Sequence, residues 1–254
     1  MQDVEPHRVA VVRIGTAGWS VSSEVRHRFG PAASGLVRYA TRLGAAEVNS
    51  SFYRPHRPAT YGRWAESVPE DFRFAVKLPK RVTHDQRLVG AEAAIDAFLA
   101  EVGCLGAKLG PILIQLPPSL AFDPPVVQAF WALLRQRTDG PLACEPRHRS
   151  WFSPVADQLL ASFRVARVGA DPPPVPGADQ PGGWPGLIYR RLHGSPRIYY
   201  SDYGNEEIRT MTETLASVDH GAAAESWCIF DNTALGFAAR NALDLAESLR
   251  ARRR

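Results

Sequence analysis

Short runs in which apolar and polar residues alternate follow one another along the chain, separated by stretches whose apolar residues recur every three to four positions. Alternation is typical of β-strands, and the longer period is typical of amphipathic helices. The strands expected on this basis cover residues 9–15, 46–52, 73–79, 109–117, 165–171, 187–193 and 226–231, and one more begins at Leu142. The expected helices cover residues 35–43, 58–67, 92–102, 124–135, 154–162, 206–218 and 235–249.

This near-regular alternation of strands and helices predicts an α/β protein, and over 254 residues it matches a (β/α)8 TIM barrel. Proline and glycine are too frequent at 171–186 for a helix, so we expect the sixth connection to be an irregular loop. The alternative is a doubly wound open sheet, but the glycine-containing turn at 15–18 lacks the spacing of a dinucleotide-binding loop. We expect one domain over residues 1–254, with an ordered core at about 9–249 and a basic tail at 250–254.

The composition, with 45% hydrophobic and 22% charged residues, is that of an ordinary globular protein. The net charge of +4 comes partly from the arginine-rich tail, so it gives only weak support to an anionic partner such as nucleic acid. Three separate cysteines without a CxxC motif predict reduced thiols and a cytoplasmic location. The first residues lack a signal-peptide pattern and no apolar run is long enough to cross a bilayer, so we expect neither export nor a membrane.

Charged residues share one parity at the end of the strand that begins at Leu142, where Glu145 and Arg147 point the same way. A buried strand can carry charge on one face only if that face looks into a polar cavity, because an unpaired buried charge costs several kcal/mol. The same parity rule predicts an inward polar set of Glu47, Asn49, Lys77, Gln115, Glu145, Arg147, Arg191, His193 and Asp231. Strand ends of a TIM barrel meet at one mouth, so these residues predict a binding site there.

Four of these residues are candidate catalytic groups. Glu145 and Glu47 are the candidate general acid and base, because two carboxylates in different surroundings can divide these roles. His193 is a candidate for proton transfer, with a histidine hydrogen-bonded to a neighbouring strand as the alternative. Lys77 is a candidate amine for Schiff-base chemistry, with an electrostatic clamp or a salt bridge to Glu47 as the alternative.

Other residues are candidates for holding a substrate. Arg147 and Arg191 are expected to grip a carboxylate or phosphate with their planar guanidinium groups, although Glu145 and Arg147 could instead form a structural ion pair. The remaining candidates for polar binding are Asn49, Gln115, Asp231 and His148. Trp19, Tyr53 and Trp151 lie just past strand ends, where they would either stack on a ligand ring or cap the barrel.

We assign no metal ligands. Glu47, Glu145, His193 and Asp231 carry the right atoms, but the nearby lysine and arginines would repel a cation. We therefore expect no cofactor, with a divalent metal as the alternative.

Several motifs are similar to those of one known family. They are Gly15-Thr16-Ala17-Gly18-Trp19, Glu47-Val48-Asn49-Ser50-Ser51-Phe52-Tyr53, Val76-Lys77-Leu78-Pro79 with Thr83-His84, Leu109-Gly110-Pro111 with Gln115-Leu116-Pro117-Pro118, Glu145 with Arg147-His148-Arg149-Ser150-Trp151, and Arg191-Leu192-His193-Gly194. In this order the set resembles the YecE-like family, domain of unknown function number 72, over nearly the whole chain. The resemblance implies a TIM-barrel fold and no particular reaction. Pro146, Arg190 and the pair Asp231-Asn232 depart from the family pattern.

The leading functional hypothesis is an enzyme, a hydrolase, lyase or isomerase, that acts on a small phosphorylated or carboxylated substrate at the mouth by acid/base chemistry. The alternatives are a nucleic-acid-binding barrel, a metal-dependent phosphoesterase-like barrel and a non-catalytic scaffold. The sequence leaves the oligomeric state open.

Overall fold

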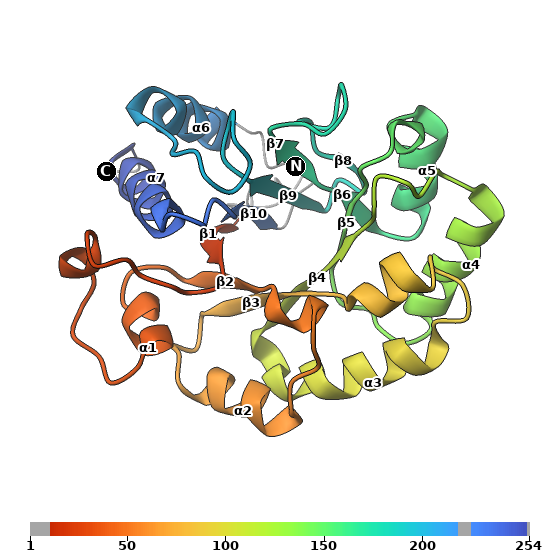
Figure 1. Cartoon of the computed structure of the whole chain (residues 1–254), viewed down its shortest axis with the longest axis horizontal. Helices are drawn as coiled ribbons and strands as arrows, with labels where there is room; N and C mark the ends of the chain where they lie inside the picture. Colours follow the sequence, from red (N-terminus) through yellow and green to blue (C-terminus); the bar gives the residue numbers. More distant parts are fainter. Residues whose placement is uncertain (1–10, 218–224, 253–254) are drawn as a thin grey trace, which may run out of the picture.

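The strands pair into one sheet that curls into a nearly closed barrel, in a computed structural model that describes residues 11–217 and 225–252 (Figure 1). The strands are β1 (Val11–Ala17), β2 (Ala45–Val48), β3 (Arg73–Lys77), β4 (Leu109–Gln115), β5 (Leu142–Glu145), β6 (Val165–Arg167), β7 (Gly169–Asp171), β8 (Gly182–Gly183), β9 (Leu187–Leu192) and β10 (Glu225–Phe230). Their order in the sheet is β7-β9-β10-β1-β2-β3-β4-β5-β6-β8. All neighbours are parallel except β6 and β8, which are antiparallel. The chain therefore has an α/β fold built on a barrel-like sheet.

Helices surround this sheet (Figure 1). They are α1 (Gly35–Ala40), α2 (Pro58–Glu66), α3 (Glu92–Val102), α4 (Pro124–Arg135), α5 (Pro154–Ser162), α6 (Asn205–Ser217) and α7 (Phe237–Arg252). Capping fixes where α1 and α5 begin: the Ser34 and Ser153 hydroxyls accept from the backbone N–H groups of Val37 and Ala156. Proline in the first turn of α2, α4 and α5 loses no helical hydrogen bond. In the part of the chain that the structure describes, no helix is long and apolar enough to span a membrane.

Two hydrophobic layers lie on opposite faces of the sheet. The outer layer joins the strands to the helices and contains most of the large buried side chains. The inner layer consists of Ala45, Ala75, Leu113, Ala143, Ala166, Val168, Leu187, Tyr189, Trp227 and Ile229. Small residues on several strands leave room inside the barrel for Tyr189 and Trp227, whose rings stack at 6.0 Å. Gly15 is required by the close approach of β1 and β2, because a Cβ there would lie 2.2 Å from the Ala45 carbonyl oxygen.

The structure corrects several predicted boundaries. The second strand ends at Val48, and the predicted strand residues 50–52 form a 3₁₀ helix that starts the loop to α2. The predicted strand 165–171 is divided into β6 and β7, which pair with β5 and β9 respectively, with Val168 between them. The short strand β8 in the sixth connection was not predicted. Residues 9 and 10 of the expected core, the end of the expected helix 206–218 and Arg253 and Arg254 of the tail lie outside the described residues.

Candidate functional site

Five strands bring a polar side chain to the same end of the barrel interior. β2 supplies Glu47, β3 Lys77, β4 Gln115, β5 Glu145 and β9 Arg191, each two residues beyond an inward hydrophobic residue of its own strand. His193 and Asp231 follow directly after the last residues of β9 and β10. All seven side chains are buried. In the register of the sheet, Gln115 and Glu145 are direct partners, whereas Glu47 is paired with Ala75 and Lys77 with Leu113.

Arg191 lies at the centre of this polar cluster and is fully buried. Its Nε and Nη2 donate to the two carboxylate oxygens of Glu47 at 3.1 and 2.8 Å. Its Nη1 donates to Oε2 of Glu145 at 2.7 Å, and Nη2 also donates to Oδ2 of Asp231 at 2.8 Å. One guanidinium therefore joins three carboxylates, two from strands β2 and β5 and one from directly after β10. Burial alone would lower the pKa of Arg191, but the three carboxylates hold it well above its ordinary value.

His193 links two of the same carboxylates. Its Nδ1 lies 3.0 Å from Oδ2 of Asp231, and its Nε2 lies 3.1 Å from Oε1 of Glu145. Burial opposes the charged ring, but Glu145 and Asp231 outweigh it and raise the pKa of His193. Ionised carboxylates only accept hydrogen bonds, so this geometry favours an imidazolium that donates from both nitrogens. Proton transfer by His193 would require one of these contacts to open.

The pKa values of Glu145 and Asp231, the two carboxyl groups that contact His193, are lowered, whereas that of His193 is raised. Burial would raise the pKa of Glu145, but Arg191, His193 and Arg147 hold it well below its usual range. Burial likewise opposes ionisation of Asp231, and Arg191 with His193 lowers its pKa nevertheless. Both groups are therefore carboxylates at neutral pH. Glu47 also accepts from the Tyr189 hydroxyl at 2.8 Å.

Arg147 lies nearer the opening. Its Nη2 donates to Oε1 of Glu145 at 3.1 Å, and its side chain is 22% exposed. Burial works against its charge, but Glu145 and a hydrogen bond with Tyr199 raise its pKa. The Tyr199 ring also packs edge-on against His193 at 5.9 Å. Guanidinium N–H groups of Arg147 that are used by neither Glu145 nor Tyr199 remain available to a ligand.

Tyr199 belongs to the loop between β9 and α6, which passes over the cluster. The loop begins at Gly194, whose φ is +93° and whose added Cβ would lie 2.7 Å from the Ser201 carbonyl oxygen, so a glycine is needed there. The Tyr199 N–H donates to the His193 carbonyl oxygen at 2.5 Å. Ile198, Tyr199 and Tyr200 are all more than a third exposed. The loop therefore adds an apolar rim beside the charged residues.

Lys77 and Gln115 carry polar groups that the cluster does not use. Neither makes an ion pair or a side-chain hydrogen bond with the described residues, although each is only 7% exposed. The Lys77 ammonium lies 4.1 Å from the centre of the Phe52 ring. Asn49 donates weakly to Asp231 at 3.4 Å, while its buried Oδ1 has no partner in the described structure. These free groups are the ones that a polar ligand could engage.

Three of the predicted binding residues lie away from the polar cluster, and a fourth lies at its rim. Trp151 is fully buried and donates to the Leu120 carbonyl oxygen at 2.9 Å, and Trp19 packs against Trp64 in the outer core at 4.9 Å. His148 caps the 3₁₀ turn 149–151 and contacts the Ser150 hydroxyl at 2.8 Å. Tyr53 is 80% exposed and touches the ring of Phe52. We retain only Tyr53 near the site, as a rim residue, and place the other three in packing or capping roles.

Sequence reasoning missed Tyr189 and Tyr199 as partners of the cluster. Tyr189 lies two residues before Arg191 on the same strand, so the alternation of the sequence could have predicted that it faces inward, where it contacts Glu47. Tyr199 had none, because its position depends on the path of an irregular loop.

The described residues contain no group of three or more His, Cys, Asp and Glu side chains arranged to hold a metal ion. Their carboxylates near the mouth are already bound by Arg191 and His193. These contacts occupy carboxylate oxygens that a metal ion would need as ligands.

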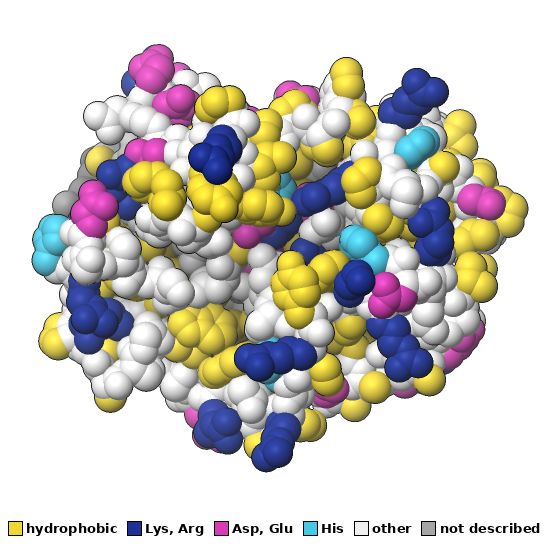
Figure 2. Space-filling view, viewed as in Figure 1, with side chains coloured by type: hydrophobic (Ala, Val, Ile, Leu, Met, Phe, Trp, Pro, Cys, Tyr) yellow, Lys and Arg dark blue, Asp and Glu magenta, His cyan; other side chains and the backbone are white. Residues whose placement is uncertain are grey.

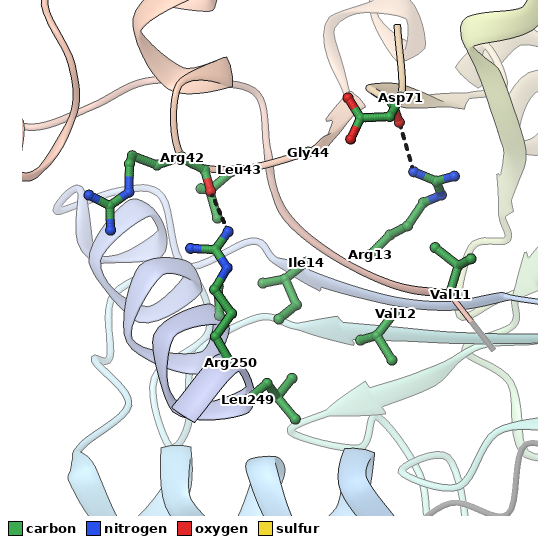
Figure 3. Close-up of a pocket in the computed structure, with 11 residues that line it drawn as sticks. Val11, Val12, Arg13, Ile14, Arg42, Leu43, Gly44, Asp71, Leu249 and Arg250 are labelled. Atoms are coloured by element: carbon green, nitrogen blue, oxygen red, sulfur yellow. Dashed lines mark hydrogen bonds between the residues drawn. The ribbon is translucent and has the colours of Figure 1, made fainter. Parts of the chain in front are cut away.

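The face with the polar cluster carries many basic side chains. In the space-filling view, Lys and Arg side chains surround a hollow near its centre (Figure 2). A separate cavity of about 250 Å³ lies beside the first residues of β1, at the opposite end of the barrel (Figure 3). Its charges are largely satisfied: Arg13 pairs with Glu225 at 3.0 Å and Arg42 with Glu247 at 2.7 Å. Because that end of such barrels serves stability, the charged mouth is the better candidate site.

An α/β chain with a barrel-like sheet and a buried charged cluster at the strand ends defines a barrel protein with a polar mouth. The family model described as "Protein of unknown function DUF72" matches residues 13–254, and the chain belongs to this family. The predicted resemblance to the YecE-like family is confirmed.

Curated relatives are similar over part of their length. The chain is 29% identical to the UPF0759 protein YecE of Escherichia coli (strain K12) over 144 residues, which cover 56% of this chain and 51% of YecE. It is 28% identical to the UPF0759 protein YunF of Bacillus subtilis (strain 168) over 162 residues, covering 61% and 57%. The chain thus spans little more than half the length of these relatives.

Two solved structures share the fold over nearly their full length. A DUF72 family protein from Enterococcus faecalis V583 is 26% identical, with a TM-score of 0.77 and coverage of 96% of this chain and 99% of that one. A DUF72 family protein from Thermotoga maritima MSB8 is 24% identical, with a TM-score of 0.76 and coverage of 94% and 99%. The barrel-like architecture is therefore that of the family.

Proposed function

We propose that the protein is an enzyme that binds a small anionic polar substrate at the barrel mouth and acts on it by acid/base chemistry. One observation carries the proposal: three carboxylates, an arginine and a histidine are buried together at the strand ends, beside donors that remain unpaired. A buried charged network is rarely retained for stability alone, because hydrophobic residues of similar volume often stabilise as well or better.

Each group has a proposed role. Arg147 receives the anionic group, because its side chain is 22% exposed and its N–H donors are not fully used. Lys77 adds an unpaired amine inside the barrel end. Arg191 keeps Glu145 and Asp231 ionised and holds both of them and Glu47 in place. Glu145 is the proposed base once a bound substrate replaces one of its contacts, and Gln115 and Asn49 orient the polar substrate.

The proposal also includes the number of strands in the barrel. We infer that β6 and β7 are one strand that changes partner at Val168, since only that residue separates them. The parallel strands would then form a (β/α)8 barrel with an irregular sixth connection, and its C-terminal mouth would hold the site. The three cysteines form no disulfide in the described structure, which supports a reducing, cytoplasmic setting.

Anion binding is the direct test, with inorganic phosphate and malonate as probes in isothermal titration calorimetry. We expect the parent to bind at least one of them and Arg147→Ala to weaken the affinity by about tenfold or more, the loss of one charge-assisted contact. Arg149→Ala is the matched control, because Arg149 is two residues away and exposed, and its side chain makes no hydrogen bond to the described residues. Equal affinities for both variants, or no binding of either anion, would count against the proposal.

Nucleic-acid binding is the second candidate. The exposed Tyr53, Tyr199 and Tyr200 could stack on bases, and the surrounding cations could contact phosphates. A single-stranded DNA gel shift at low salt tests it: binding that weakens with salt and with Tyr53→Ala would favour this function, and no shift would remove it.

A further inference from the structure

Lysine is rare in this chain, which has 27 arginines and only three lysines: Lys77, Lys80 and Lys108. Lys80 is about half exposed and pairs with Asp85 at 3.3 Å. Lys108 donates to the carbonyl oxygens of Ala65 and Val68 at 2.5 and 2.6 Å. Lys77 alone of the three is buried with an ammonium group that makes no ion pair or hydrogen bond to the described residues.

The position of Lys77 is built by the barrel. It is the last residue of β3 and points into the interior with Glu47 and Glu145, and the Phe52 ring packs against its ammonium group. Burial and the charge of Arg191 lower the pKa of Lys77 to about 8, although Glu145, Glu47 and Asp231 partly oppose this. A neutral amine is therefore available at physiological pH to a far greater extent than on the surface.

A proton acceptor, His84, packs edge-on against the same Phe52 ring, with the two ring centres 5.1 Å apart. Burial and the charges of Lys77, Lys80 and Arg147 lower the pKa of His84, so its ring is neutral at pH 7. Its Nδ1 contacts the Thr83 hydroxyl at 2.8 Å, while no hydrogen bond of Nε2 to the described residues is present. Arg147 supplies a cation at the same opening.

We propose that Lys77 is a catalytic amine that forms a Schiff base with an aldehyde or ketone substrate carrying a carboxylate or phosphate group. The inference rests on the proposed function, since the anionic group is held at the mouth by Arg147. A Schiff base also explains why position 77 holds a lysine and not an arginine: an arginine would hold an anion equally well but cannot deprotonate to become a nucleophile.

The step is balanced without a further reactant. The Lys77 nitrogen, after giving one proton to His84, attacks the carbonyl carbon, so that a C–N bond forms and the π electrons move to oxygen. The oxygen takes up a second proton from the nitrogen and the proton held by His84, and leaves as water. The product is an iminium whose positive charge is that of the original ammonium. This cation withdraws electrons from the adjacent C–H or C–C bond, where a carboxylate such as Glu145 can accept a proton.

Reductive trapping tests the inference. The protein is incubated with glyoxylate or pyruvate and sodium cyanoborohydride, and each lysine is followed by peptide mass spectrometry. We expect an adduct on Lys77 that forms at least about tenfold faster than on Lys80, with a yield that rises with pH through the amine's midpoint. Lys77→Arg should abolish it, and Lys80→Arg, the matched control, should leave it unchanged.

Equal labelling of Lys77 and Lys80, or labelling of Lys80 without Lys77, would overturn the inference. Circular dichroism of Lys77→Arg shows whether that variant is folded. If it is not, the ratio of the adduct on Lys77 to the adduct on Lys80 in the parent protein still decides whether Lys77 is the reactive amine. The outcome is separable from the anion test: phosphate or malonate binding that depends on Arg147, without an adduct on Lys77, contradicts only the Schiff base. Failure of both removes the proposed function as well.

Discussion

A single arginine organises the charges at the mouth of the barrel. Arg191 contacts Glu47, Glu145 and Asp231, which come from three segments far apart in the sequence. Its guanidinium offers five N–H groups in a plane, a geometry that lysine cannot supply. The remaining cations then have different tasks: His193 bridges two carboxylates, Arg147 faces the opening and Lys77 stays unpaired.

Replacing the central arginine should expose how much the fold depends on it. Arg191→Met leaves three buried carboxylates without their main partner, and we expect the free energy of unfolding in urea to fall by about 3 to 5 kcal/mol at pH 7. Arg209→Ala on the exposed face of α6, where Arg209 pairs with Glu206 and Glu213, should barely change it. An Arg191→Met protein as stable as the parent would show that the network contributes nothing to folding.

The carboxylates predict how stability changes in acid. The pKa of Glu145 is lower in the folded than in the unfolded chain, so its contribution is present above about pH 4 and is lost as the pH falls through the folded value. Glu145→Gln lacks this contribution. We expect the variant to be less stable by about 3 kcal/mol at pH 7, with a gap that closes as the pH falls below about 4, in urea unfolding. Glu207→Gln at the exposed start of α6 should show no comparable gap; a constant gap for Glu145→Gln would contradict the pKa shift.

At the scale of elements, the loop between β9 and α6 is the part of the site with the most demanding backbone. Gly194 takes a positive φ, and the loop then places Tyr199 against His193 and Arg147. Gly62, in contrast, lies inside α2 with nothing within 4 Å of an added Cβ. The same substitution should therefore have opposite effects at the two glycines.

Gly194→Ala should destabilise the protein by about 1 to 3 kcal/mol, because the new Cβ meets the Ser201 carbonyl oxygen in a left-handed conformation. Gly62→Ala should stabilise it by about 0.5 to 1 kcal/mol, through the better helix propensity of alanine. Thermal and urea unfolding of the two variants compare them directly. A neutral Gly194→Ala would mean that the loop can adopt another path without loss.

The same elements show what the sequence could predict. Alternation in β3 and β9 correctly indicated which side chains face inward, because the two-residue period of a strand leaves little choice. It failed at residues 50–52, where alternating residues form a 3₁₀ helix, since a single short turn has no period of its own. Trp151 lies just past a strand end in the sequence, which predicted a residue at the rim. In the structure it lies in the core, because the loop after β5 brings its indole N–H to the Leu120 carbonyl oxygen.

At the scale of the whole molecule, the barrel-like sheet separates two environments. The outer face of the sheet and the part of the barrel interior lined by the inner hydrophobic layer are apolar, whereas the C-terminal ends of the strands carry the charged cluster. The family match and the shared fold of the solved DUF72 structures extend this architecture beyond the present chain. Sequence alone predicted that the polar residues would converge, but not that Arg191 would bind three of the carboxylates while Lys77 stays free, because side-chain pairing depends on distances across the barrel.

The titration of Lys77 tests the account most directly. The protein can be labelled with ¹³C-lysine, and because it has only three lysines, each ¹³Cε signal can be assigned with Lys→Arg variants and followed from pH 6 to 11 by NMR. We expect the Lys77 signal to titrate with a midpoint at about pH 8, well below the ordinary lysine value of about 10.4. A Lys77 midpoint at or above that of Lys80 would contradict the buried, unpaired amine on which the proposed chemistry depends.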